Sequence, residues 1–180
     1  SPTFEEYAGT LKRMVPSLFA DGLVRGFTEF GRSVHAKISW VARGVETIKE
    51  AGNRRIIIIH AGSDMFLRTC YCPKQFPLRV EVYSPTSLED RTFKLKSVSA
   101  DCPLTEHDIV GPLCFGGDKI CEQIALPRVD IDDIVVVRDA VANCLSLWSR
   151  HCSRLSPAVY GYSFGESDHG RVLTVQTLRE

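Results

Sequence analysis

The sequence has no excess of either charge and no long apolar run, and both absences limit what the chain can do. Its 180 residues include 22 basic and 22 acidic side chains, so the formal net charge is zero. Nucleic-acid-binding proteins show a basic patch, as do many that bind anionic membranes. No apolar stretch approaches the roughly 20 residues of a membrane-spanning helix, and the N-terminus lacks the pattern of a signal peptide. We therefore expect no nucleic-acid partner and no membrane partner.

Cysteine is present, but without the pattern of a disulfide framework or a metal site. The seven cysteines are an odd number and are irregularly spaced, unlike those of a small secreted scaffold. We expect a reducing compartment, cytosolic or organellar, and assign the chain to the cytoplasm. The tightest groupings, Cys70-x-Cys72 and His151-Cys152, lack the paired spacing of a zinc site. No bound metal is expected.

Short strands dominate the apolar pattern that remains. Hydrophobic residues make up 44% of the chain and charged residues 24%, as in ordinary globular proteins. The N-terminal residues predict one amphipathic helix, which starts after Thr3 and ends before Pro16. Lys119–Leu126 is expected to be a strand or a short helix, Ala140–Ser149 a short helix and Ser84–Ser87 a loop. Strands are expected over Leu23–Phe30, most of Val34–Lys49, Arg54–His60, Leu78–Tyr83, Phe93–Ala100, Ile134–Val137, Pro157–Tyr162 and Arg171–Leu178. Many short strands with few helices indicate a β-sandwich or barrel.

The most informative stretch is Gly111-Pro112-Leu113-Cys114-Phe115-Gly116-Gly117-Asp118. Its glycines allow backbone angles and close approaches that other residues resist. Cys114 therefore lies where the main chain bends and can present its thiol. The alternative is a turn between strands with a buried cysteine, since free cysteine is among the most buried residue types.

This segment resembles the Gly-Pro-x-Cys-x-(Ser/Gly)-x-Asp element of fold-type III pyridoxal-phosphate amino-acid decarboxylases, the group of diaminopimelate, ornithine and related decarboxylases. Four other segments resemble further landmarks of that family, in the family's order. They are Glu29-Phe30-Gly31-Arg32, His60-Ala61-Gly62 with Leu67-Arg68, Val137-Arg138-Asp139-Ala140, and Ser153-Arg154-Leu155-Ser156-Pro157-Ala158. The five landmarks together extend over nearly the whole chain.

The resemblance implies a mainly β fold in two parts. Residues 34–180 would form the family's C-terminal β-domain, a β-sandwich or Greek-key barrel. Residues 1–33 would be the last helix and strand of an α/β (TIM-type) barrel. The family's Schiff-base lysine lies on the first strand of that barrel, and no lysine here stands in that context. We therefore expect that this chain alone is not catalytic.

The resemblance also implies a cofactor, pyridoxal 5′-phosphate, and residues that would bind it. Glu29 would contact the pyridine nitrogen, and Gly31 and Arg32 would lie near the phosphate, where a guanidinium suits a dianion. Asn143 stands where the family usually has a tyrosine near the cofactor. For Glu29 and Arg32 the alternative is a surface ion pair.

The remaining landmark residues would meet an amino-acid substrate. Arg68 would hold the substrate carboxylate, and Cys114 would protonate the substrate carbon after carbon dioxide leaves. Asp118 would face the distal part of the substrate. Phe115 stands where relatives carry an acid that contacts a distal ammonium, so a substrate without a simple distal ammonium is expected.

The family's dimer is head-to-tail, so Cys114 and Asp118 would reach into the partner subunit's site. The parent reaction would be α-decarboxylation of an amino acid, with either a homodimer or a separate barrel half completing the site. One alternative is a non-catalytic paralogue that binds or regulates an active decarboxylase. Another is an all-β interaction domain with no link to the cofactor. For His60, a histidine that finishes a buried strand is favoured over a catalytic role.

Overall fold

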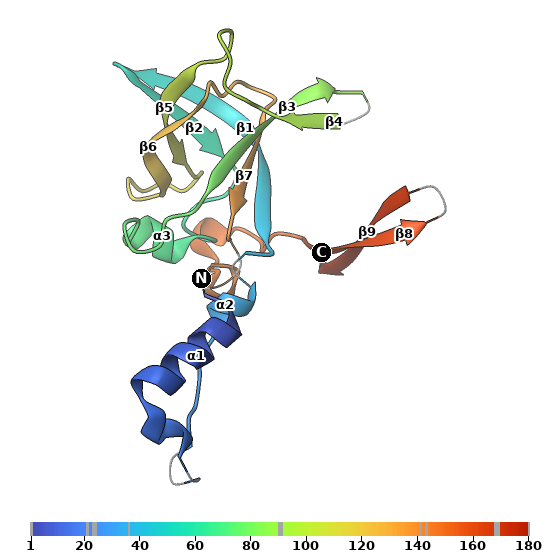
Figure 1. The fold of residues 1–180 in the computed structure, drawn as a ribbon. Helices are drawn as coiled ribbons and strands as arrows, with labels where there is room; N and C mark the ends of the chain where they lie inside the picture. Colours follow the sequence, from blue (N-terminus) through green and yellow to red (C-terminus); the bar gives the residue numbers. More distant parts are fainter. Residues whose placement is uncertain are drawn as a thin grey trace.

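A strand-rich body makes up most of the molecule, with a helical arm at one end and a two-stranded hairpin at its side (Figure 1). This computed structural model describes residues 2–20, 22, 25–35, 37–89, 92–140, 142, 144–167 and 170–179. The body contains a seven-stranded sheet in the order β4-β3-β7-β1-β2-β5-β6. Its neighbouring strands are antiparallel except for the parallel pair β2–β5. Its strands are β1 (Trp40–Ala51), β2 (Arg54–Ile59), β3 (Val80–Ser87), β4 (Thr92–Leu95), β5 (Leu104–Val110), β6 (Lys119–Pro127) and β7 (Ile134–Arg138).

Strand β1 joins the two halves of this sheet. Residues 40–44 pair with β7, and residues 45–51 pair with β2, with a register shift between Val45 and Thr47. A bulge of this kind bends a strand and increases its twist. The sheet curls as a result, and β3 comes close to β6. Its inner side holds one hydrophobic core, which includes Val45, Ile57, Ile59, Phe66, Val82, Ile109, Ile120, Val129, Val135 and Val137.

Four consecutive isoleucines form most of β2, and they explain its central place. Ile57 and Ile59 are completely buried, whereas Ile56 and Ile58 are half-buried. The predicted strand is confirmed, with one face fully buried and the other partly. A turn precedes it at Gly52, whose φ of +64° is one that glycine adopts without a steric penalty.

The helical arm begins as its sequence predicts. Helix α1 (Phe4–Met14) starts with a capping box in which Thr3 and Glu6 hydrogen-bond reciprocally, and η1 (Pro16–Phe19) follows it. No residue of α1 is buried, although Tyr7 packs edge-on against Phe30 with ring centroids 4.9 Å apart. Its apolar face is therefore exposed within this chain.

Several predicted elements are wrong or too long. Residues 25–30 form no strand, and the short helix α2 (Gly31–His35) follows them. A strand needs a hydrogen-bonded neighbour, and no described strand pairs with residues 25–30. Ser84–Ser87 belongs to β3 rather than to a loop, and β4 ends at Leu95.

Two elements were not predicted, one predicted helix is shorter than expected, and one segment left open between strand and helix is a strand. Helix α3 (Leu67–Tyr71) and strand β5 were both missed. The predicted helix after Ala140 is reduced to η2 (Leu145–Leu147), followed by η3 (His151–Ser153). The ambiguous segment Lys119–Leu126 is strand β6. The predicted division between residues 33 and 34 falls within α2 and stays a prediction.

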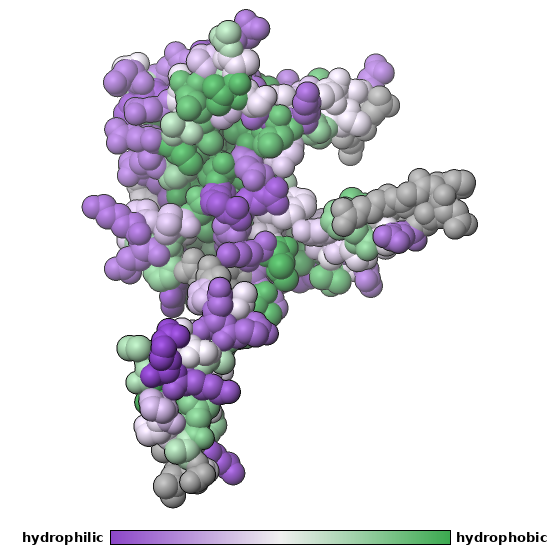
Figure 2. All heavy atoms as spheres, in the orientation of Figure 1, coloured by the Kyte–Doolittle hydropathy of each residue, from purple (hydrophilic) through white to green (hydrophobic). Residues whose placement is uncertain are grey.

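The last two strands, β8 (Val159–Ser167) and β9 (Gly170–Arg179), pair only with each other among the described strands. Both were predicted, and both are longer than expected. Exposed apolar and aromatic side chains lie along the hairpin and along α1 (Figure 2). On the hairpin they are Tyr160, Tyr162, Phe164, Leu173, Val175 and Leu178. None of the described helices is long and apolar enough to cross a membrane.

Candidate functional site

The loop that carries Cys114 lies between β5 and β6 and is held by the carboxylate of Asp118. Asp118 is only 3% exposed. Its Oδ2 accepts a hydrogen bond from the Leu113 backbone N–H at 2.7 Å, and its Oδ1 accepts one from the Ser63 N–H at 2.6 Å. The Gly111 N–H also donates to the Asp118 carbonyl at 2.9 Å. One buried side chain therefore joins the Cys114 loop to the loop after β2.

Two glycines make room for this carboxylate. A Cβ atom added at Gly62 or at Gly111 would overlap the Asp118 carboxylate. The absence of a side chain at both positions lets the two loops approach each other. The segments around His60 and Cys114, which resemble separate family landmarks, are thus brought together around Asp118.

A second buried carboxylate, that of Asp64, joins the Ser153–Ala158 landmark to the loop after β2. Asp64 is 1% exposed, and its Oδ1 accepts from the Gly62 N–H at 3.2 Å. Its Oδ2 accepts from Arg154 Nε at 2.7 Å. Arg154 also donates from Nη1 to His60 Nε2 at 2.9 Å and from Nη2 to the His60 carbonyl at 3.0 Å. His60 follows β2 directly, and its ring is held by Arg154.

The thiol of Cys114 is exposed to solvent, on the outside of the loops that Asp118 and Asp64 hold together. The alternative of a buried cysteine is therefore wrong. Its Sγ lies 3.6 Å from Cys152 Sγ, which is also exposed. The ring of the next residue, Phe115, stacks on His151 with centroids 5.5 Å apart and an interplanar angle of 9°. The loop that carries Cys114 is therefore held by the Asp118 hydrogen bonds and by the stacking of Phe115 on His151.

Arg68 lies on α3, close in sequence to Asp64. Its side chain is exposed, and its guanidinium lies over the Phe76 ring, 5.1 Å from the ring centroid. No carboxylate of the described residues forms an ion pair with it. Its charge is available to an anion, and the predicted contact with a substrate carboxylate stays a prediction.

The predicted cofactor residues lie elsewhere in the chain. Glu29 is exposed in the irregular segment before α2, and Gly31, the first residue of α2, has open space where a side chain would lie. An accessible carboxylate and an unobstructed backbone suit a pyridine nitrogen and a phosphate. The side chain of Arg32 and the whole of Asn143 lie outside the described residues. No described hydrogen bond or ion pair joins Glu29 or Gly31 to the Cys114 loop.

The Arg138–Asp139 landmark fixes the end of β7 to the start of the neighbouring strand β3. Arg138 Nε donates to Glu81 Oε2 at 2.9 Å, and Arg79 Nε donates to Asp139 Oδ2 at 2.7 Å. The hydrogen bond from Arg138 is the main reason why the pKa of Glu81 is lowered, and it outweighs the opposing effect of burial. The hydrogen bond from Arg79 likewise lowers the pKa of Asp139. These contacts give the landmark a role in the fold.

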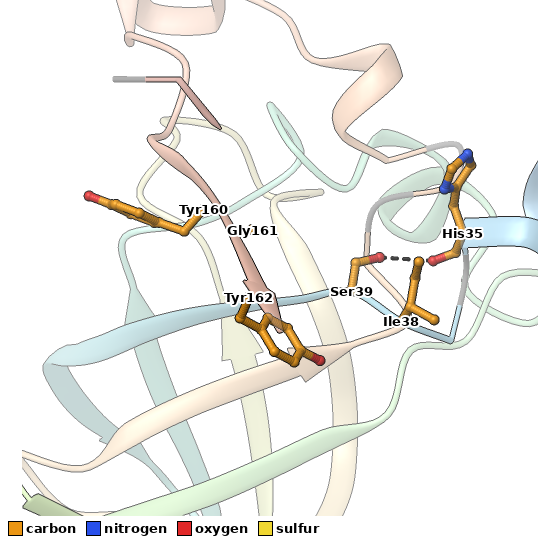
Figure 3. Close-up of a pocket in the computed structure, with 6 residues that line it drawn as sticks. All are labelled: His35, Ile38, Ser39, Tyr160, Gly161 and Tyr162. Carbon is orange, nitrogen blue, oxygen red and sulfur yellow. Dashed lines mark hydrogen bonds between the residues drawn. The ribbon is translucent and has the colours of Figure 1, made fainter. Parts of the chain in front are cut away.

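A shallow hollow of about 420 Å³ lies between the end of α2, the segment that leads into β1, and the hairpin (Figure 3). It is lined by His35, Ile38, Ser39, Tyr160, Gly161 and Tyr162. The Ser39 hydroxyl donates to the His35 carbonyl at 2.9 Å. None of the residues predicted to carry chemistry lines this hollow, so we do not assign the site to it.

Sequence reasoning missed three residues that contact the predicted site residues or their supports. Ser63, Asp64 and Cys152 were not singled out as functional residues. Asp64 follows Gly62 closely, and Cys152 precedes the Ser153–Arg154 landmark, so proximity to the landmarks was the available signal.

Fold and site together define a curled β-sheet domain that presents a cysteine on a loop held by buried carboxylates. The family described as pyridoxal-dependent decarboxylase, C-terminal sheet domain, matches residues 37–141. Because this match extends over more than half of the chain, the chain belongs to that family. The resemblance to fold-type III decarboxylases and the mainly β fold are both confirmed.

Curated relatives are named diaminopimelate decarboxylases. A probable chloroplastic diaminopimelate decarboxylase of Oryza sativa subsp. japonica is 29% identical over 133 residues, 73% of this chain and 24% of the relative. The diaminopimelate decarboxylase of Zymomonas mobilis is 27% identical over 153 residues, 85% of this chain and 31% of the relative. The chain therefore spans about a quarter to a third of the length of these relatives.

Solved structures share the fold over almost the whole chain. AQ1208 from Aquifex aeolicus has a TM-score of 0.72 at 20% identity, with 99% of this chain and 38% of that chain covered. Diaminopimelate decarboxylase from M. jannaschii in complex with L-lysine has a TM-score of 0.69 at 19% identity, with 99% and 36% covered.

Proposed function

We propose that this chain is the C-terminal part of a pyridoxal-phosphate-dependent α-amino-acid decarboxylase of the diaminopimelate type. The observation that carries the proposal is the family match over residues 37–141, which contain the Cys114 loop. The named relatives support the substrate class, and the L-lysine complex of the M. jannaschii structure is consistent with it. The chain would contribute residues to a composite site between two head-to-tail subunits.

On its own side of the dimer, the chain would hold part of the cofactor. Glu29 would accept a hydrogen bond from the protonated pyridine nitrogen, and Gly31 with Arg32 would lie at the phosphate. When bound, pyridoxal phosphate supplies an electron sink for the carbon–carbon bond that breaks. The exposure of Glu29 and the open space at Gly31 support this assignment. Asn143, where the family has a tyrosine, would border the cofactor.

On the partner's side, the chain would supply the proton donor. Cys114 Sγ would give its proton to the substrate α-carbon after carbon dioxide leaves, as a general acid. Such a donor must be held in position, and the two hydrogen bonds that Asp118 accepts from Leu113 and Ser63 do this. We assign Asp118 this positioning role in addition to the substrate contact, which remains a proposal.

Two further residues would define the substrate. Arg68 would bind a substrate carboxylate, because its guanidinium is exposed and has no described carboxylate partner. Phe115, stacked on His151, would face the distal end. A phenylalanine cannot accept a hydrogen bond from an ammonium, so we propose a substrate whose distal end is not a simple ammonium.

Substitution of Cys114 tests this function directly. We expect Cys114→Ala, in the native-length protein that contains this chain, to lower kcat for carbon dioxide release by about 100-fold or more. The substrate panel contains diaminopimelate, lysine, ornithine and arginine, and also leucine and glutamate, whose distal ends carry no ammonium. Cys72→Ser, at another exposed cysteine, is the control and should leave kcat unchanged.

Two outcomes would contradict the proposal. One is a Cys114→Ala protein with the kcat of the wild type. The other is a folded, cofactor-loaded wild-type protein that releases no carbon dioxide from any member of the panel, which would favour the non-catalytic paralogue.

A further inference from the structure

Cys114 and Cys152 are 38 residues apart in sequence, yet their sulfur atoms lie 3.6 Å apart and both side chains are exposed. A disulfide brings two sulfur atoms to about 2.05 Å, so a small side-chain movement would close this gap. We propose that the two cysteines form a reversible intrachain disulfide with a low-molecular-weight disulfide as oxidant, and that this bond withdraws Cys114 from proton transfer. The link itself follows from the geometry, whereas its effect on activity rests on the proposed function.

The sequence neighbours of both cysteines are fixed, which keeps the two thiols together. Leu113 and Asp118 hold the Cys114 loop through a 2.7 Å hydrogen bond. On the other side, Arg154 is anchored to Asp64 and His60. The stacked rings of Phe115 and His151 form a second bridge, because each ring belongs to the residue next to one of the two cysteines. The pair is therefore organised before oxidation, which favours intrachain over intermolecular bonding.

The backbone at Cys152 is also unusual. Its φ is +54°, and Ser153 follows with a φ of +59°. Residues with a Cβ seldom adopt this left-handed conformation. At Cys152 it coincides with a thiol that lies against Cys114, and such conformations persist where the surrounding contacts hold them in place.

The other cysteines are less suited to this exchange. Burial raises the pKa of Cys70 and of Cys121 to about 12. The thiolate is the reactive form, so these two react slowly at neutral pH. The hydrogen bond between the two thiols raises the pKa of Cys152, and we therefore expect the exchange to become faster as the pH rises. Cys72 is exposed and provides a control for general thiol reactivity.

The exchange balances with oxidised glutathione as the oxidant. One protein thiolate attacks a glutathione sulfur, which breaks the glutathione disulfide and releases one glutathione thiolate. The second protein thiolate then attacks the protein-bound sulfur, forms the Cys114–Cys152 bond and releases the second glutathione. Two electrons pass from the protein thiols to glutathione, and both thiol protons end on the released glutathiones.

Peptide mapping after redox equilibration tests the link. The native-length protein is incubated in mixtures of reduced and oxidised glutathione, alkylated, digested with trypsin and examined by mass spectrometry. Cleavage gives one peptide of residues 97–119, with Cys102 and Cys114, and another of residues 151–154, with Cys152. We expect a linked pair of these peptides and the loss of two titratable thiols, both reversed by a reducing agent.

Four variants decide which sulfur atoms are joined. The link should persist in Cys72→Ser and Cys102→Ser and disappear in Cys114→Ser and Cys152→Ser. No link in the wild type at any glutathione ratio, or a link that survives in Cys152→Ser, would overturn the proposal.

Activity is measured on the same samples, so that failure of the link and failure of the proposed function are separated. We expect activity to fall with the linked fraction in the wild type. Cys152→Ser should retain activity at those glutathione ratios at which mass spectrometry finds no mixed disulfide between Cys114 and glutathione. A link that forms without loss of activity would confirm the pair and contradict the role of Cys114 as proton donor.

Discussion

At the scale of single residues, two buried carboxylates hold the loops of the site together. Asp118 and Asp64 are almost fully buried, and both bind backbone N–H groups of the loop after β2. A buried carboxylate is tolerated when hydrogen bonds compensate for its lost hydration. The loop that exposes Cys114 is therefore held in place by carboxylates that are themselves buried.

Gly111 is expected to be indispensable for this arrangement. A Cβ atom there would overlap the Asp118 carboxylate, so we expect Gly111→Ala to lower the free energy of unfolding by about 1–3 kcal/mol. Gly116→Ala, in the same loop, is the matched control because a Cβ there meets no atom within 4 Å. Urea unfolding of both variants measures the difference. Equal free energies of unfolding for Gly111→Ala and Gly116→Ala would contradict the prediction, because the loop would then accommodate the added methyl group.

The sequence predicted the individual landmarks but not the contacts that join them. The glycines and the cysteine of the Cys114 loop are visible as a local pattern. The partners of Asp118 and Arg154 are 55 and 90 residues away in sequence at Ser63 and Asp64, and no local pattern reports such distances. Cys152 was missed for the same reason, because its proximity to Cys114 depends on the fold.

At the scale of elements, charged pairs fix β7 beside β3. Glu81 on β3 and Arg138 on β7 are hydrogen-bonded across the strand pair, and the Tyr83 hydroxyl donates to Glu81 at 3.2 Å. β7 also pairs with β1 and so connects this edge of the sheet to the core. The family landmark that contains Arg138 thus contributes to sheet assembly.

This contact predicts a pH-dependent contribution to stability. The pKa of Glu81 is lowered in the folded chain, chiefly by the hydrogen bond from Arg138. Folding therefore favours the ionised form, whose contribution is present above the ordinary pKa of 4.5 and is lost as the pH falls through the lowered value. We expect Glu81→Gln to cost about 0.5–1 kcal/mol at neutral pH and nothing in strong acid.

Urea unfolding of the wild type and Glu81→Gln at neutral and acidic pH measures this contribution. Glu46→Gln is the control, because Glu46 is exposed on β1 and forms no ion pair with another described residue. A stability difference for Glu81→Gln that is equal at both pH values would contradict the ionic explanation.

Elements with a continuous apolar pattern were predictable, and elements with buried polar groups were not. The isoleucine run of β2 gave a correct strand. β5 was missed because His107 and Asp108 stand at buried positions. His107 is satisfied by the Val129 N–H at 3.2 Å, and Asp108 accepts from the Gln123 N–H at 2.9 Å. Val129 and Gln123 lie outside β5. The sequence of β5 alone therefore does not show that His107 and Asp108 find hydrogen-bond partners when they are buried.

At the scale of the whole molecule, the body contains the hydrophobic core, whereas none of the residues of α1 is buried and the hairpin exposes apolar side chains (Figure 2). Phe4 and Met14 on α1 are 56% and 71% exposed. Exposed apolar patches of this kind mark interaction surfaces. Tyr7 on the same helix is also exposed. We expect the arm and the hairpin to pack against other parts of a dimer.

The central claim is that one chain contributes Glu29 to its own cofactor pocket and Cys114 to its partner's site. Mixing two inactive variants of the native-length protein, Glu29→Ala and Cys114→Ala, tests this claim most directly. In a mixed dimer, one site would contain both substitutions and the other would contain neither. We predict that dissociation and reassociation of the mixture restores carbon dioxide release that neither variant shows alone. A mixture that forms mixed dimers but stays inactive would contradict the account, because both residues would then serve the same chain's site.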